Sequence, residues 1–369
     1  MEKPLTDPPQ HLLEVGASSK TALSTTAAVR ARRDWQGFAK AKLDSLTKPP
    51  GSLGRLEEIA AKIVSIQEQE SPACANKAVY VFAADHGVTE EGVSAYPKAV
   101  TQQMVRNFLA NGAAINVLAR CARAEVIVVD VGVDAEFEPH ERLIAKKIRR
   151  GTRNIAIGPA MTDSEVNAAL AVGRTLAQEA RVGNLELIGI GEMGIGNTTA
   201  AAAITAALSG KPVAEVTGSG TGVSRQALIH KRQIIEKALN VNDVNRNSRP
   251  LDVLRKVGGL EVAAMTGMML ETSEQRIPVV IDGFISTAAA ALAYTIEPNV
   301  KEILFAGHVS EEPGHWSLLK YIGLEPILSL GMRLGEGTGA VLAMMLIEAA
   351  VSTFNEMATF SSAGVSGAL

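Results

Sequence analysis

Two glutamates of this sequence stand in glycine-rich turns, each directly before an apolar or alanine-rich stretch. Glu192 occurs in the segment GIGEMGIGNTTAA, and Glu336 lies between Gly335 and Gly337 in LGEGTGA. Small neighbours let a turn present a carboxylate to a ligand, and partial burial raises the pKa of a carboxyl group so that it can act as a general base near neutral pH. Glu336 is therefore a candidate general base. The alternative is an acid that complements the dipole of the following helix.

The start of the first segment also spells GxGxxG, the fingerprint of dinucleotide-binding domains. In that interpretation Gly189, Gly191 and Gly194 form the tight turn beside a pyrophosphate, and Glu215 binds the ribose. Glu192 lies within the fingerprint, where its charge would repel a pyrophosphate unless the side chain pointed away. The motif alone is a weak signal in a chain with 33 glycines, and an ordinary strand-to-helix turn is a second interpretation.

A third interpretation of the same segment is a phosphate site. Gly194 and Gly196 can bring backbone N–H groups close to an anion, while Asn197 and Thr198 are good capping residues for a helix expected over 199–208. One phosphate at a helix terminus with one carboxylate beside it suits a mononucleotide better than a dinucleotide. The residues of this segment by themselves leave all three interpretations open.

Short apolar runs between helix-like stretches predict the elements that must position these residues. Their alternation with helices predicts an α/β fold, with an open, mostly parallel, Rossmann-like sheet flanked by helices. Polar residues and glycines follow each run, as in Asp85-His86-Gly87 and Asp282-Gly283-Phe284. Ligands bind outside the carboxyl ends of the strands in such a sheet, so we expect these loops to converge on one cleft. The runs are residues 79–82, 126–129, 187–188, 279–281 and 303–305.

The two ends of the chain do not follow this alternation. Apolar positions at helical spacing predict an amphipathic helix from Arg55 to Glu70. We expect residues 28–75 and 340–369 to form a smaller helical subdomain beside an α/β catalytic domain at 76–339. Residues 1–27 carry acids and prolines where a secretion signal needs a continuous apolar core, so we expect a disordered extension there.

Composition limits the possible partners. The formal net charge of −3, without a block of lysines or arginines, argues against nucleic acid and anionic membranes. The longest apolar runs stop short of the ~20 residues of a membrane span, and two distant cysteines are consistent with a reducing cytoplasm. We expect no metal, because a metal-dependent hydrolase built on residues such as His86, His308 and His315 would lack HExxH, HxH and paired-cysteine spacing.

Several longer segments occur together, in the order found in one enzyme family. From about Asp34 to about Phe354 the sequence resembles the nicotinate-nucleotide:dimethylbenzimidazole phosphoribosyltransferases, with one departure at Asn111, where a glycine is expected. The resemblance implies a homodimer without a cofactor. It also implies transfer of ribose 5-phosphate from nicotinate mononucleotide to 5,6-dimethylbenzimidazole, which gives nicotinate and α-ribazole 5′-phosphate for the lower nucleotide of cobalamin. The segments are KPPGSLGRLE, ADHGVTEEGVSAYPKAVTQQMVRNFLANGAAINVLAR, GEMGIGNTTAAAA, TGSGTG, DGFISTAAA, GHVSEEPGH and LGEGTGA.

The resemblance also implies roles for individual residues. Glu336 matches the general base, and Glu192 is expected to stabilise positive charge on the ribose. A benzimidazole pocket is matched by Ser94, Gln102 and the backbone of Leu334. A phosphate site is matched by Gly194, Lys231 and Ser310, beside Gly196 and Asn197 of the same turn. The alternatives are an NAD-binding oxidoreductase that uses the GxGxxG at 189–194 and a protein that only binds benzimidazoles.

Overall fold

The structure is a computed structural model that describes residues 33–218, 220, 222 and 224–366. The extension predicted for residues 1–27 lies outside this part of the chain. Residues Trp35–Leu369 form one compact unit, and the elements below belong to it.

The centre of this unit is a seven-stranded parallel sheet with the order β3-β2-β1-β4-β5-β6-β7. This order confirms the predicted Rossmann-like α/β fold, and the chain reverses direction across the sheet between β1 and β4, where such folds bind ligands. Four strands contain predicted apolar runs, and β6 contains the fifth except for Ile303, which ends the preceding 3-10 helix. The strands are β1 (Lys77–Ala84), β2 (Glu125–Gly132), β3 (Leu143–Ala145), β4 (Leu187–Met193), β5 (Val279–Ile281), β6 (Leu304–His308) and β7 (Pro326–Leu328).

The edge strands β3 and β7 are not among the predicted elements. Each has three residues, LIA and PIL, and most of these side chains are half-buried. A three-residue strand is too short to show a periodicity, and its pairing depends on a neighbour that is already in place. Tertiary structure therefore decides both edges of the sheet.

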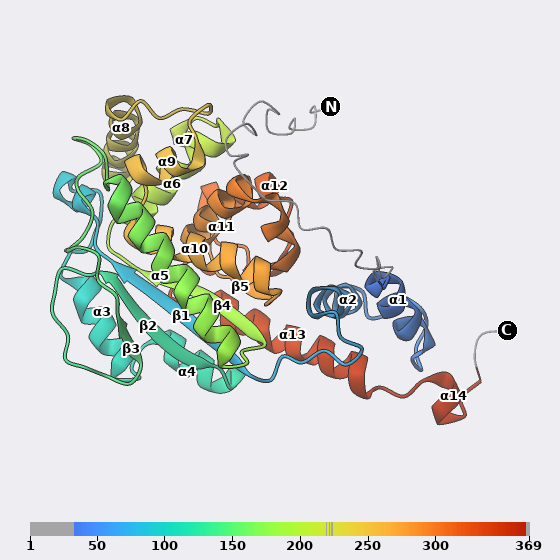
Figure 1. The fold of residues 1–369 in the computed structure, drawn as a ribbon. Helices are drawn as coiled ribbons and strands as arrows, with labels where there is room; N and C mark the ends of the chain where they lie inside the picture. The colour runs from blue at the N-terminus through green and yellow to red at the C-terminus, as the bar shows by residue number, and fades with distance from the viewer. Residues whose placement is uncertain (1–32, 219, 221, 223, 367–369) are drawn as a thin grey trace, which may run out of the picture. The chain divides into compact units, whose positions relative to one another are not determined.

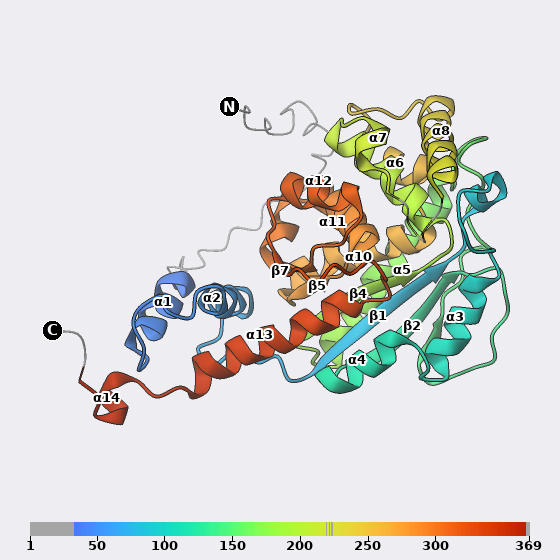
Figure 2. The same ribbon diagram turned by 180° about the vertical axis from the view of Figure 1, so that it is seen from behind.

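Helices cover both faces of the sheet (Figures 1 and 2). One face contacts α4 (Ala114–Ala122) and α13 (Thr338–Glu356), and the other contacts α10 (Leu260–Gln275) and α11 (Phe284–Ile296). Against α10 packs α5 (Asp163–Val182). The remaining longer helices are α1 (Trp35–Ser45), α2 (Arg55–Gln67), α3 (Val100–Leu109), α6 (Asn197–Ser209), α8 (Arg225–Val241), α9 (Pro250–Val257) and α12 (Pro313–Ile322).

Short helices complete the described chain. They are η2 (Gly87–Glu91), α7 (Val213–Val216), η3 (Pro298–Ile303) and α14 (Phe360–Ala363).

The amino-terminal helices contact the long carboxyl-terminal helix. Helix α2 packs on both α1 and α13, whereas α13 also runs along β4, β5 and β6. These contacts agree with the expected association of the two ends of the chain, while the division into a separate subdomain stays a prediction. The predicted helix from Arg55 ends at Gln67 rather than at Glu70, because Glu68 adopts a left-handed conformation with φ 52°.

By length and composition alone, α13 is also apolar enough to cross a membrane, the one such helix in the described part of the chain. More than half of its apolar window is buried inside the protein, against α2, α4 and the sheet. Its apolar residues are therefore accounted for by the core.

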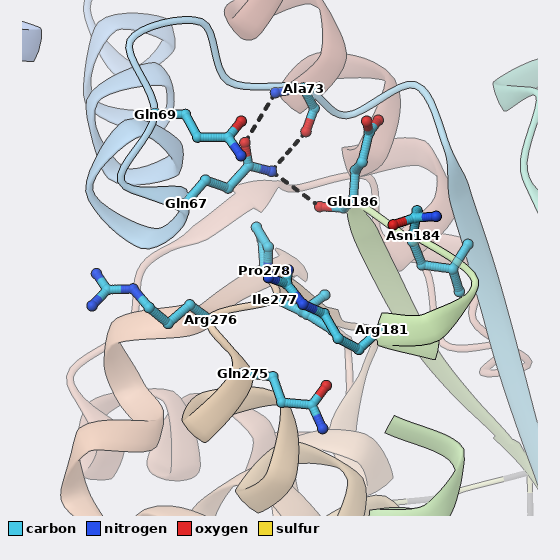
Figure 3. Close-up of a pocket in the computed structure, with 11 residues that line it drawn as sticks. Gln67, Gln69, Ala73, Arg181, Asn184, Glu186, Gln275, Arg276, Ile277 and Pro278 are labelled. Atoms are coloured by element: carbon cyan, nitrogen blue, oxygen red, sulfur yellow. Dashed lines mark hydrogen bonds between the residues drawn. The ribbon is translucent and has the colours of Figure 1, made fainter. Parts of the chain in front are cut away.

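A small hollow of about 230 Å³ lies at the amino ends of β4 and β5 (Figure 3). The side-chain amide of Gln67 donates to the carbonyls of Ala73 at 2.7 Å and Glu186 at 3.3 Å, and its oxygen accepts from the Ala73 N–H at 2.9 Å. These bonds fix the end of α2 to the start of β4. None of the predicted site residues lies in this hollow.

Asn111, the departure from the family pattern, lies between α3 and α4 with φ 61°. Glycine adopts this left-handed conformation most easily, and asparagine does so more readily than most other residues. The Arg142 guanidinium donates a hydrogen bond to the Asn111 side-chain oxygen. The asparagine therefore preserves the turn that a glycine would make.

We expect Asn111→Ala to lower the free energy of unfolding by about 1 kcal/mol, because alanine tolerates a positive φ poorly. Asn111→Gly should stay within about 0.5 kcal/mol of the wild type, since it loses only an exposed side-chain contact. Urea unfolding followed by circular dichroism measures both. Equal stabilities of the Ala and Gly variants would contradict this explanation.

Candidate active site

A cavity of about 490 Å³ opens at the carboxyl side of the sheet. The segments that follow β1, β4, β5 and β6 and the turn before α13 contribute to its wall. The predicted convergence of loops therefore holds after β4, β5 and β6, whereas the predicted loop after β1, Asp85-His86-Gly87, and the one after β2 do not line the cavity. There Asp130 turns back to accept the Val133 N–H at 2.8 Å, and it does not reach the cavity.

One part of the wall is apolar. Tyr96, Val100 and Met104 come from α3 and the turn before it, at a spacing of four residues, and Met193 ends β4. Phe284, at the start of α11, adds an aromatic ring. Residues four apart lie on the same side of a helix, so the spacing of the α3 residues was a readable signal that our sequence analysis missed.

Glu336 lies in the turn before α13 and lines the cavity. It has φ 64° and stands between Gly335 at 86° and Gly337 at 90°, so three successive residues are left-handed. The side chain is 6% exposed, and its Oε2 has no hydrogen-bond partner among the described residues.

Burial raises the pKa of the Glu336 carboxyl to about 7. A hydrogen bond from the backbone of Ile115, at the start of α4, acts against this rise, and the negative charge of Asp282 adds to it. Acid and base forms of Glu336 therefore coexist near neutral pH, as a general base requires.

Glu192 lines the same cavity at the end of β4. Burial raises its pKa well above the usual value, and the charges of Asp282, Glu261 and Glu336 add to the rise. The side-chain amide of Asn197 donates to Oε2 of Glu192, which favours the charged form. The pKa of Glu192 remains raised despite this hydrogen bond.

The structure corrects the capping role expected for Asn197 and Thr198. Helix α6 begins at Asn197, and its cap is Gly196, with φ 96° and no side-chain hydrogen bond. Both residues therefore lie inside the first turn, where Asn197 reaches back to Glu192 and Thr198 faces Lys231. The left-handed glycine shifts the start of the helix by two residues relative to the expected start at 199.

Gly194 makes the closest approach of this turn to the sheet. A Cβ at this position would lie 2.3 Å from the carbonyl oxygen of Ala84 at the end of β1. Only glycine fits there, so the turn after β4 lies directly on the end of β1.

Lys231 of α8 does not line the cavity itself but contacts residues of its polar wall. Its side chain is buried, and its Nζ donates to Oγ1 of Thr198 at 2.7 Å. Burial lowers the pKa of the Lys231 ammonium to about 8, and the nearby Glu312 acts in the opposite direction. Lys231 thus remains largely charged at neutral pH beside two residues of the wall, Thr198 and Gly220.

Ser310 lines the cavity and is held by the buried His315, which the sequence offered only as a metal-ligand candidate. Nδ1 of His315 accepts the Ser310 N–H at 2.8 Å, and its Nε2 lies 2.9 Å from Oγ1 of Thr287. Thr287 donates its own proton to the Gly283 carbonyl at 2.7 Å, so His315 donates from Nε2 and is neutral. Burial lowers the pKa of His315 to about 3, in agreement with this assignment.

Two predicted residues of the benzimidazole pocket do not line the cavity. Oγ of Ser94 accepts the Tyr96 N–H at 3.2 Å, and Oε1 of Gln102 accepts from Arg106 at 3.1 Å. Leu334 does line the wall, with Arg333, which donates to the Gly220 carbonyl at 3.1 Å. The roles predicted for Ser94 and Gln102 stay predictions.

The histidines considered and rejected as metal ligands have other partners. Nε2 of His86 lies 2.6 Å from Oε1 of Glu261, and Nε2 of His308 lies 3.5 Å from Oδ1 of Asp282. Within the described residues there is no group of three or more His, Cys, Asp or Glu side chains arranged to hold a metal ion. The arrangement gives the metal-dependent hydrolase no support.

Comparison with known proteins identifies the family. A sequence model described as phosphoribosyltransferase matches residues 29–365. The chain is 57% identical to a nicotinate-nucleotide–dimethylbenzimidazole phosphoribosyltransferase of Geobacter sp. (strain M21) over 327 residues, which cover 89% of this chain and 93% of the relative. It belongs to this family.

Other phosphoribosyltransferases of the family agree. The enzyme of the same name from Geotalea uraniireducens (strain Rf4) is 58% identical over 89% of this chain and 93% of its own. The crystal structure of CobT from Thermus thermophilus superposes with a TM-score of 0.87 at 49% identity, over 91% of this chain and all of that chain. The family resemblance and the enzyme class expected from the sequence are thereby confirmed, and the NAD-binding alternative is not supported.

We expect Gly194→Ala to lower the free energy of unfolding by about 1–3 kcal/mol, because the new methyl group overlaps the Ala84 carbonyl. The same change should also weaken phosphate binding at the turn before α6, the candidate phosphate site. Gly158→Ala is the matched control, since a Cβ there meets no atom within 4 Å and φ is not in the left-handed region. Chemical unfolding of both variants tests this, and equal stabilities would contradict the close packing.

Proposed function

We propose that this phosphoribosyltransferase moves ribose 5-phosphate from nicotinate mononucleotide to 5,6-dimethylbenzimidazole. The products are nicotinate and α-ribazole 5′-phosphate, which serves the lower nucleotide of cobalamin. The observation that carries the proposal is Glu336, whose carboxyl lines the cavity with a pKa of about 7 and one oxygen without a partner among the described residues. The names of the close relatives support the same substrates.

The reaction needs one base. An imidazole nitrogen of the acceptor forms a bond to C1′ of the ribose, and the C1′–N bond of the donor breaks with its electron pair going to the pyridine nitrogen. The pyridinium thus leaves as a neutral ring, without an acid to protonate it. The proton on the other acceptor nitrogen passes to Glu336. Attack opposite to the leaving group converts the β-nucleotide into the α-product.

Glu192 is better suited to stabilise the positive charge that develops on the ribose than to accept a proton. The donor pyridinium carries a positive charge, and the charge moves onto the ribose as the C1′–N bond breaks. A nearby cation favours the carboxylate form of Glu192, which the neighbouring acids otherwise disfavour. Its stabilising effect would therefore be greatest where the positive charge develops.

The phosphate site combines a cation with neutral donors. Lys231 supplies the charge, Thr198 and Ser310 supply hydroxyl groups, and the Gly194–Gly196 turn brings the start of α6 close. His315 already accepts the backbone N–H of Ser310, so Ser310 would bind the phosphate through its hydroxyl. A phosphate dianion would also raise the pKa of Lys231 back towards its usual value.

The acceptor would lie against the apolar wall formed by Tyr96, Val100, Met104 and Met193. We assign Ser94, Gln102 and the Leu334 backbone to its surroundings on the resemblance alone. A homodimer and a cytoplasmic location are proposed on the same basis.

Nicotinate release from nicotinate mononucleotide, with and without 5,6-dimethylbenzimidazole, tests the reaction directly. We expect release to require the acceptor and to decline as the pH falls through about 7, because protonated Glu336 cannot accept a proton. Glu336→Gln should lower kcat by about 100- to 10 000-fold and abolish this pH dependence. A fully active Glu336→Gln variant, or a wild type without release, would refute the mechanism.

Replacement of Lys231 tests the phosphate site. Lys231→Met should raise KM for nicotinate mononucleotide by about 10- to 100-fold, since a hydrogen bond to a charged group contributes about 1.5–3 kcal/mol. KM for the benzimidazole should change little. Lys237→Met, an exposed lysine on the same helix, is the control and should behave as the wild type. An unchanged KM for the nucleotide in Lys231→Met would contradict this assignment.

A further inference from the structure

Asp282 follows β5 directly, and its side chain is 2% exposed. Its carboxylate crosses to the start of α13, where Oδ1 accepts the N–H groups of Gly339 at 2.6 Å and Ala340 at 3.1 Å. Oδ2 accepts the Gly337 N–H at 3.0 Å. Three backbone donors around the Glu336 turn thus share one carboxylate from a neighbouring strand.

The turn needs such support. A left-handed conformation is unfavourable for a residue with a side chain, and Glu336 adopts it between two left-handed glycines. The cap of α13, Gly337, has no side chain to bind the free N–H groups of the first turn. Asp282 binds these groups instead, and bonds to a charged acceptor are about twice as strong as neutral ones.

Titratable groups face Asp282 from the neighbouring elements. His308 approaches from β6, with Nε2 3.5 Å from Oδ1, and Glu192 faces it from β4. Glu336 faces it from the turn, so the negative charge of Asp282 raises the pKa of Glu336. The Ile115 backbone N–H acts on Glu336 from the opposite side, at the start of α4.

We propose that Asp282 is a positioning residue: by capping α13 it holds the Glu336 turn in the conformation that directs the carboxylate into the cavity. Asp282 does not line the cavity and therefore acts through Glu336. This role rests on the proposed function, in which Glu336 is the base.

Asp282→Asn is the first test. The amide keeps one acceptor oxygen but places an NH₂ group against a backbone donor, so the turn loses at least one bond. We expect kcat to fall by about 10- to 100-fold, as displacement of a catalytic group does, with KM for both substrates within about threefold of the wild type. The acid limb of the pH profile, where kcat declines as the pH falls, should move to lower pH. The reason is that the substitution removes the negative charge of Asp282, which raises the pKa of Glu336.

A double-mutant cycle separates this role from a general effect on the fold. In the Glu336→Gln background, Asp282→Asn should cause little further loss of kcat, because residues that act as a unit are not additive. A full additional loss in that background would overturn the proposal. So would a large rise in KM with unchanged kcat, since Asp282 would then act on substrate binding.

Asp130→Asn is the matched control. Asp130 is a buried aspartate near the end of β2 that accepts a backbone N–H at 2.8 Å, but it does not reach Glu336. We expect it to lower stability without moving the acid limb. A shift of the limb equal to that of Asp282→Asn would show that the effect is general, and would overturn the proposal.

A second variant and a structure cover the other outcomes. Asp282→Glu keeps the charge but moves the acceptor oxygens. Its kcat should therefore fall while the acid limb stays in place. A wild-type kcat in this variant would overturn the proposal even if Asp282→Asn does not fold. A crystal structure of either variant should show residues 335–337 displaced. An unchanged turn would refute positioning whatever the activity, whereas a wild type without nicotinate release would refute only the proposed function.

Discussion

The turn that carries Glu336 lies directly on the backbone of β4, and the geometry of the cavity depends on this contact. A Cβ at Gly191 would lie 2.4 Å from the nitrogen of Gly337, and a Cβ at Gly335 would lie 2.4 Å from Oε1 of Glu192. Glycine at both positions therefore lets two carboxylates from distant parts of the chain become neighbours. Asp282 reinforces the same contact from the adjacent strand.

This packing concentrates negative groups in a buried region. Glu192, Glu261 and Asp282 lie close enough for their charges to interact, and Glu336 adds a fourth. Burial and the neighbouring negative charges raise the pKa values of Glu192 and Glu336, which favours their protonated forms. In the proposed reaction, the positive charge that the pyridine nucleotide brings, and that its ribose acquires during transfer, would favour the charged forms of these two glutamates.

The sequence predicted the central strands because each contains a continuous apolar run, as buried parallel strands do. It did not predict the edge strands, whose three residues acquire their conformation from pairing. It assigned Asn197 to a cap, although a left-handed Gly196 starts the helix two residues earlier than expected and directs Asn197 to Glu192. The apolar wall was also missed, although Val100 and Met104 of α3 have the spacing of one helical face.

By itself the sequence determined the fold class and the residue types able to do the chemistry, because periodicity and glycine turns are local properties of the chain. The family followed from the resemblance of its longer segments, taken in order, to a known family. Tertiary structure alone decided which of those residues meet. Glu336 gains its raised pKa from burial and from Asp282, and Lys231 gains its place beside Thr198 from the packing of α8 on α6. Desolvation and charge–charge interaction depend on distances in space, and those distances are set by the packing of the sheet and its helices.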